Sequence, residues 1–156
     1  MPDLLVKLYE LPPMTSAMDQ MACQGVIIRR ALPPEKHLIA AWVEKHFRPA
    51  WAAECEVALS RLPVSCFIAV ENEALLGFAC HEATCKGFFG PTGVLESARG
   101  RGVGKALLLA VLHDMRASGY NYAVIGGAGP TEFYAKVCGA TVIENSAPGI
   151  YRGMLK

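Results

Sequence analysis

Apolar residues recur along the chain with two periods, and stretches of the two kinds alternate. Runs that are β-branched, or that alternate apolar and polar residues, predict strands at 5–11, 25–32, 66–70, 74–85, 86–95, 120–127, 140–144 and 150–156. Apolar residues spaced three and four apart predict helices at 33–47, 50–62, 103–118 and 129–138. Hairpins in the first half and a strand–helix–strand unit in the second indicate a mixed sheet with helices on both faces.

The strand–helix–strand unit runs from the strand at 86–95 through the helix at 103–118 to the strand at 120–127. A crossover of this kind is right-handed and makes its two strands parallel. A glycine-rich segment follows Ile125, so little holds the strands together beyond that point. We therefore predict that the two strands diverge towards their C-terminal ends.

Composition narrows the class of protein. With 156 residues, 53% of them hydrophobic and 19% charged, we expect a single domain, 1–156, with residues 1–24 as an N-terminal extension that holds one extra short strand. A net charge of +1 argues against a nucleic acid or a membrane surface as partner. The N-terminus does not resemble a secretory signal, and the six cysteines form no CxxC pair. Together these features predict reduced thiols and a cytoplasmic protein.

The turn before the helix at 103–118 carries the most informative chemistry. Its sequence, RGRGVGK at 99–105, places glycines and cations in front of an apolar helix. The first amides of a helix have no partners within it and carry about half a positive charge, so this end binds phosphate readily. Glycine lets a bulky anion approach the backbone, and we expect a pyrophosphate there. A P-loop is excluded because Arg99 and Ala106 stand where it needs glycine and Ser or Thr, and Lys105 breaks the dinucleotide fingerprint.

Residues 99–104, Arg-Gly-Arg-Gly-Val-Gly, resemble the signature (Q/R)-x-x-G-x-(G/A) of the GNAT superfamily of acyl-CoA-dependent N-acyltransferases. EFYAKVCGA at 132–140 is similar to a helix of that family, and the order of elements matches from residue 25 to residue 156. The resemblance implies an α/β fold (α+β in some schemes) with a mixed sheet of about six to seven strands, splayed between its fourth and fifth strands. It also implies acetyl-CoA as co-substrate, bound at Val94, Leu95, Arg99, Gly100, Arg101, Gly102, Val103, Gly104 and Lys105.

The resemblance further implies a reaction. An amine would attack the thioester carbonyl directly, and the backbone amide near Val94 or Leu95 would stabilise the oxyanion. Tyr134 matches the family tyrosine that faces the departing sulfur, and it would hydrogen-bond the leaving thiolate. The alternative for Tyr134 is a core residue that packs a short helix.

The sequence leaves the identity of the general base open. Glu96, Glu82 and His81 could each take a proton from an incoming ammonium, with Glu96 as the provisional candidate and a solvated surface side chain as the alternative for each. His81 and Glu82 lie on opposite faces of a strand, so at most one can face the cleft. The chain departs from the family at Gly127, where asparagine is common, and at Glu96, where many members have proline. No metal is expected, because strand alternation scatters the cysteines around His81 over two faces.

Three classes of function account for these residues to different extents. An N-acetyltransferase acting on a primary amine, in a small molecule or a peptide, explains the turn, the separating strands and Tyr134 together. A non-catalytic acyl-CoA-binding or sensing module explains the turn and leaves Tyr134 incidental. Another nucleotide-phosphate binder explains only the glycines and the local charge. We therefore predict an acetyltransferase, with the acceptor unspecified and a homodimer left open.

Overall fold

The computed structural model describes residues 1–156 and contains seven strands. They are β1 (Leu4–Lys7), β2 (Ile27–Arg30), β3 (Cys66–Glu71), β4 (Ala74–His81), β5 (Phe88–Val94), β6 (Tyr122–Ile125) and β7 (Thr141–Val142). They form one sheet in the order β2-β3-β4-β5-β6-β1-β7, in which β5 and β6 are parallel and all other neighbours are antiparallel. The mixed α/β fold predicted from the sequence is confirmed.

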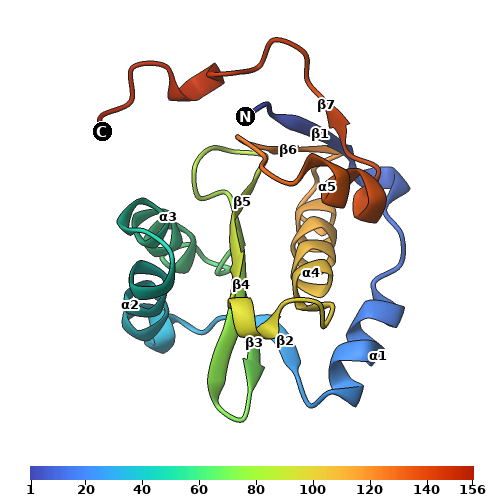
Figure 1. Ribbon diagram of the computed structural model, residues 1–156, viewed down its shortest axis with the longest axis vertical. Helices are drawn as coiled ribbons and strands as arrows, with labels where there is room; N and C mark the ends of the chain where they lie inside the picture. Colours follow the sequence, from blue (N-terminus) through green and yellow to red (C-terminus); the bar gives the residue numbers. More distant parts are fainter.

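Five helices cover the two faces of this sheet (Figure 1). They are α1 (Thr15–Cys23), α2 (Lys36–His46), α3 (Pro49–Leu59), α4 (Val103–Ala117) and α5 (Thr131–Cys138), with four short 3-10 helices, η1 (Leu8–Glu10), η2 (Pro33–Glu35), η3 (Glu96–Ala98) and η4 (Gly149–Tyr151), between elements. Residues of α2 and α3 form the core on one face, and residues of α1, α4 and α5 form it on the other. The sequence predicts four of the five helices. It misses α1, in which only Ala17 and Met21 are buried, so that little apolar periodicity shows.

The end of the chain differs from the prediction. Residues 150–156 do not form a strand: η4 is followed by irregular chain in which Gly153 has a φ of +76°. The strand that pairs with both β6 and β7 is instead β1, from the N-terminal extension. Its Leu4 and Val6 are almost completely buried in the core, whereas the side chains of residues 152–156 are exposed. Burial of two apolar side chains therefore favours the N-terminal strand in this position.

The two parallel strands separate as predicted. β5 and β6 are paired only at Phe88 with Val124 and at Phe89 with Ile125. β5 then continues to Val94, whereas β6 ends and the chain turns away at Gly127, whose φ is +54°. The rest of β5 therefore has a neighbour on the β4 side only, and its other edge is open.

Candidate functional site

The glycine-rich turn leads directly from η3 into α4. Gly100 and Gly102 have φ values of +76° and +89°, a left-handed conformation that glycine adopts without strain. None of the six backbone amides from Gly100 to Lys105 donates a hydrogen bond within the chain. These free amides lie at the positive end of a fifteen-residue helix, which is the arrangement that binds phosphate groups.

A hollow of about 300 Å³ lies over this turn. It is lined by Val94, Ala98, Arg99, Gly100, Gly102, Val103, Gly104, Lys105 and Phe133. Seven of these nine residues are among the predicted acetyl-CoA residues; Ala98 and Phe133 are additions from the structure. Arg99 and Lys105 bring positive charge to the hollow, so it suits an anion.

Two of the residues predicted to bind acetyl-CoA, Arg101 and Leu95, have other partners within the chain. The guanidinium of Arg101 pairs with Glu71, with an N–O distance of 2.6 Å, and its Nε donates to Gln24 at 3.0 Å. Arg101 therefore contributes its backbone amide but not a free cation to the turn. The amide of Leu95 donates to the carbonyl of Leu76 at 2.8 Å, so it cannot stabilise an oxyanion.

The open edge of β5 has free amides that can donate to an oxyanion in place of the Leu95 amide. In an antiparallel pair, hydrogen-bonded and non-hydrogen-bonded residue pairs alternate. Because Leu95 is hydrogen-bonded opposite Leu76, the next pair, Val94 with Gly77, is non-hydrogen-bonded, and so is Thr92 with Ala79. The amides of Val94 and Thr92 therefore point away from β4, into the space that β6 has left.

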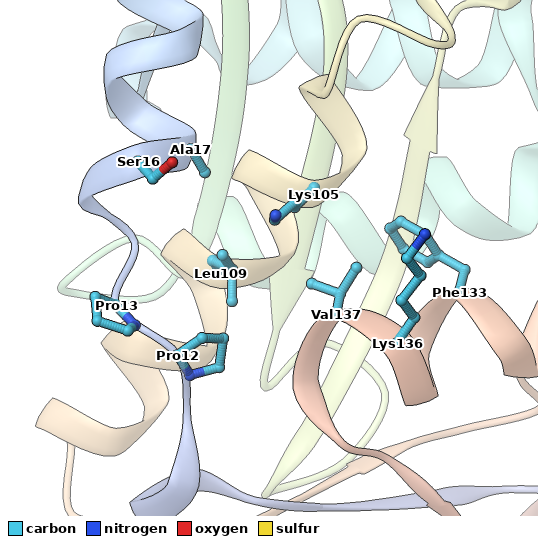
Figure 2. A pocket seen from close by; sticks show the side chains of 9 residues that line it. All are labelled: Pro12, Pro13, Ser16, Ala17, Lys105, Leu109, Phe133, Lys136 and Val137. Carbon is cyan, nitrogen blue, oxygen red and sulfur yellow. The ribbon is translucent and has the colours of Figure 1, made fainter.

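A second hollow, of about 450 Å³, adjoins the first (Figure 2). It is lined by Pro12, Pro13, Ser16, Ala17, Lys105, Leu109, Phe133, Lys136 and Val137. Lys105 and Phe133 line both hollows, so the two hollows share part of their walls. Figure 2 shows Lys105 on α4, directed towards the side on which α1 lies, and Lys136 on α5, extending alongside Phe133. The sequence gives one weak signal for Lys136: it follows Phe133 by three residues and so shares its helix face.

Tyr134 lies beside the point where the strands separate. It is 6% exposed, and its ring packs edge-on against Phe89 and Phe133 at centroid distances of 6.2 and 5.2 Å. Burial, and then the neighbouring Cys138, raise the pKa of its hydroxyl to about 12. The hydroxyl has no hydrogen-bond partner, yet it is not among the fully buried polar atoms that lack one, so it reaches open space. Tyr134 is therefore both a packing residue and a free, protonated donor.

None of the three candidate bases lines either hollow. Glu96 is exposed in η3, and its side chain makes no hydrogen bond or ion pair. The carboxylate of Glu82 accepts hydrogen bonds from the Gly87 amide and the Tyr120 hydroxyl, which occupy both of its oxygens. Glu82 therefore braces the loop between β4 and β5.

His81 is buried on the α4 side, where its Nε2 contacts Oδ2 of Asp114 at 2.8 Å. Arg30 also hydrogen-bonds this carboxylate. Burial raises the pKa of Asp114, but the hydrogen bonds from His81 and Arg30 outweigh it and lower the pKa to about 2. His81 thus belongs to a partly buried hydrogen-bonded cluster, with Arg30 and Asp114, that ties α4 to the sheet.

All six cysteines are free thiols, and no group of three or more His, Cys, Asp or Glu side chains is arranged to hold a metal ion. None of the helices combines the length and the apolar character that crossing a membrane requires.

The split between β5 and β6, beside an open helix N-terminus, defines the α/β fold of acyl-CoA-dependent N-acyltransferases. A family model described as the acetyltransferase (GNAT) family matches residues 28–140, and the chain belongs to that family. Membership supports acetyl transfer from acetyl-CoA in general terms. No curated protein sequence matches the chain.

Solved structures of low sequence identity share the fold. A GCN5-related glucosamine N-acetyltransferase region of a fungal multi-domain GH3 β-N-acetylglucosaminidase has a TM-score of 0.74 and 16% identity over 91% of this chain. A GCN5-related N-acetyltransferase from Sphaerobacter thermophilus has a TM-score of 0.66 and 21% identity over 91% of this chain. The chain spans 19% of the first protein and 48% of the second. A GNAT family acetyltransferase from Brucella melitensis, in complex with acetyl-CoA, has a TM-score of 0.54 and 22% identity over 76% of this chain and 86% of its own.

Proposed function

We propose that this protein is an N-acetyltransferase that moves an acetyl group from acetyl-CoA to a primary amine in a ternary complex. The observation that carries the proposal is the run of six unbonded backbone amides from Gly100 to Lys105. Residues 101–104 are buried or half-buried, and an amide without a partner is costly there, so this row at one helix end indicates a ligand with several acceptor oxygens. The pyrophosphate of acetyl-CoA has such oxygens.

The surroundings of the turn suit the remainder of acetyl-CoA. The second hollow, with Lys105 and Lys136, offers apolar walls and two cations to the phosphorylated nucleoside end. The open edge of β5 offers the amides of Val94 and Thr92 to the amides and thioester of the pantetheine arm. The structure of the Brucella melitensis relative with acetyl-CoA supports the same co-substrate for this chain.

In the reaction, the lone pair of a neutral amine forms a carbon–nitrogen bond at the thioester carbonyl, and the negative charge passes to the carbonyl oxygen. The Val94 amide points into the opening and stabilises that oxyanion, an interaction worth several kcal/mol in other acyl-transfer sites. The carbon–sulfur bond then breaks, and the electron pair leaves with the sulfur as a thiolate. The proton released by the nitrogen restores the thiol of CoA.

Tyr134 acts on that thiolate by hydrogen bonding. With its pKa near 12, against about 8.5 for a thiol, full proton transfer from the phenol would be uphill by about 5 kcal/mol. A hydrogen bond to the developing negative charge has no such barrier, and charge-assisted hydrogen bonds are strong.

A product assay over a panel of primary amines tests this function. With acetyl-CoA and a suitable amine, we expect free CoA and the acetylated amine to appear together in equal amounts, measured by mass spectrometry. Mass spectrometry is preferred to a thiol-reactive dye because Cys23 is exposed and would react with the dye. If acetyl-CoA binds but no amine in a broad panel is acetylated, the protein is a binding or sensing module and not a transferase.

A further inference from the structure

A second phenol lies at the strand separation, on the opposite face of the sheet from Tyr134. A Cβ atom placed on Gly126 would lie 2.8 Å from the hydroxyl oxygen of Tyr151 and 2.9 Å from the Phe88 ring. Gly126 is the first residue after β6, so the Tyr151 hydroxyl lies at the point where β5 and β6 part. Phe88 and Phe89 alternate across the sheet, and Tyr134 packs on Phe89. The two hydroxyls therefore flank the opening from its two faces.

The Tyr151 side chain belongs to η4, in the C-terminal segment. Figure 1 shows this segment running from β7 back across the end of the sheet towards the side on which α3 lies. It follows the part of the chain that the family model matches. Tyr151 is half-buried, and its hydroxyl has no hydrogen-bond partner and is not fully enclosed, so it is available to a ligand.

Two carboxylates, Glu54 and Asp3, lie near enough to Tyr151 to act on its hydroxyl electrostatically. Burial raises the pKa of Tyr151, and the nearby Glu54, Asp3 and Cys85 add to the rise. On α3, the Glu54 side chain accepts a hydrogen bond from the Thr84 hydroxyl through Oε1, which leaves Oε2 free. Oδ1 of Asp3 accepts from the Gly127 amide at 2.8 Å and holds the turn that follows β6.

Neither carboxylate has a counter-ion. No lysine, arginine or histidine side chain lies within ion-pairing distance of Glu54 or Asp3. Two carboxylates near a half-buried phenol, neither of them neutralised by an ion pair, give the opening a negative potential. A positively charged group bound there would supply the counter-ion that both carboxylates lack.

Building on the proposed function, we propose that Tyr151 and Glu54 form the acceptor side of the same site, and that the acceptor is an aliphatic amine that is a cation in solution and carries no carboxylate. Glu54 takes one proton from the incoming ammonium, which becomes the neutral nucleophile, and later returns that proton to solvent. The Tyr151 oxygen accepts a hydrogen bond from the amine and aligns it. Asp3 supplies negative charge and fixes the turn.

Two amines of equal chain length test this assignment: 1,5-diaminopentane, which is a dication, and 5-aminopentanoate, which carries a carboxylate. We expect the wild-type protein to acetylate the diamine with a kcat/KM at least about tenfold higher. Glu54→Gln should lower kcat/KM for the diamine about tenfold and reduce the preference, while acetyl-CoA affinity and Tm stay unchanged. Glu56→Gln is the matched control, since Glu56 lies two residues further along α3, exposed and without a side-chain contact.

Equal or better use of 5-aminopentanoate by the wild type would overturn the assignment, and so would equal behaviour of the two glutamine variants. If neither amine is acetylated, calorimetric titration of the diamine into the CoA-saturated protein tests whether the acceptor subsite exists. Binding that Glu54→Gln weakens and Glu56→Gln does not supports the subsite. No binding at millimolar diamine, with CoA still bound, overturns the subsite alone, whereas failure of CoA itself to bind overturns the proposed function.

Discussion

Replacing Tyr134 with phenylalanine is expected to lower the turnover of acetyl transfer by about one to three orders of magnitude, or roughly 1.4–4 kcal/mol in the barrier. The hydroxyl interacts with the leaving sulfur only as the carbon–sulfur bond breaks. Its removal therefore affects the transition state far more than the bound substrate. Phenylalanine keeps the ring contacts with Phe89 and Phe133, so acetyl-CoA affinity and Tm should stay nearly unchanged.

Steady-state kinetics of Tyr134→Phe, with calorimetric titration and thermal unfolding of the same preparation, measure these effects separately. Tyr9→Phe is a suitable control, because Tyr9 is an exposed phenol that contacts only Tyr122 through its hydroxyl. A large fall in Tm with little loss of turnover would show that the Tyr134 hydroxyl serves packing instead. Full activity of Tyr134→Phe would end the catalytic assignment.

Replacing Val94 with proline is expected to lower kcat/KM by about two orders of magnitude, because proline removes the one amide that points from this residue into the opening. Val94 is in a non-hydrogen-bonded pair with Gly77, so the ladder to β4 loses no hydrogen bond. The loss should therefore appear in kinetics and not in stability.

Val94→Ala is the matched control, since it removes the same side chain and keeps the amide. Leu95→Pro should give the converse result, a lower Tm, because the Leu95 amide bonds to Leu76. Equal kcat/KM for Val94→Pro and Val94→Ala, in folded protein, would mean that the Val94 amide does not contact the reacting group.

Local sequence patterns were sufficient to predict the glycine-rich turn and the strand and helix on either side of it. Glycines at 100, 102 and 104 and the apolar stripe of the following helix are signals within a few residues, and the structure places this turn at the start of α4. The separation of β5 from β6 was also predictable. Connectivity makes the strands parallel, and the glycine-rich segment after Ile125 ends the pairing.

Features that depend on contacts between distant segments could not be predicted. Residues 150–156 are rich in apolar side chains and are predicted as a strand, but β1 pairs with β6 and β7 instead because it buries Leu4 and Val6. The Arg101 side chain faces Glu71, thirty residues away, and nothing near Arg101 in the sequence reveals that its charge is neutralised. The approach of Tyr151 to Gly126 likewise depends on the path of the C-terminal segment.

The central claim is that acetyl-CoA binds at the turn from Arg99 to Lys105, and calorimetric titration of Gly104 variants tests it most directly. Gly104 is preferable to Gly102, whose φ of +89° would strain any side chain. At position 104, a Cβ would lie 3.7 Å from Val94 Cγ2, an ordinary contact, so Gly104→Ala should fold and bind acetyl-CoA much as the wild type does.

Gly104→Glu brings a carboxylate to the floor of the hollow, where like charges repel and the side chain blocks the approach of phosphate to the free amides. We expect its affinity for acetyl-CoA to be at least tenfold weaker than that of Gly104→Ala, a difference of about 1.4 kcal/mol. Equal affinity of folded Gly104→Glu and Gly104→Ala would contradict binding at this turn.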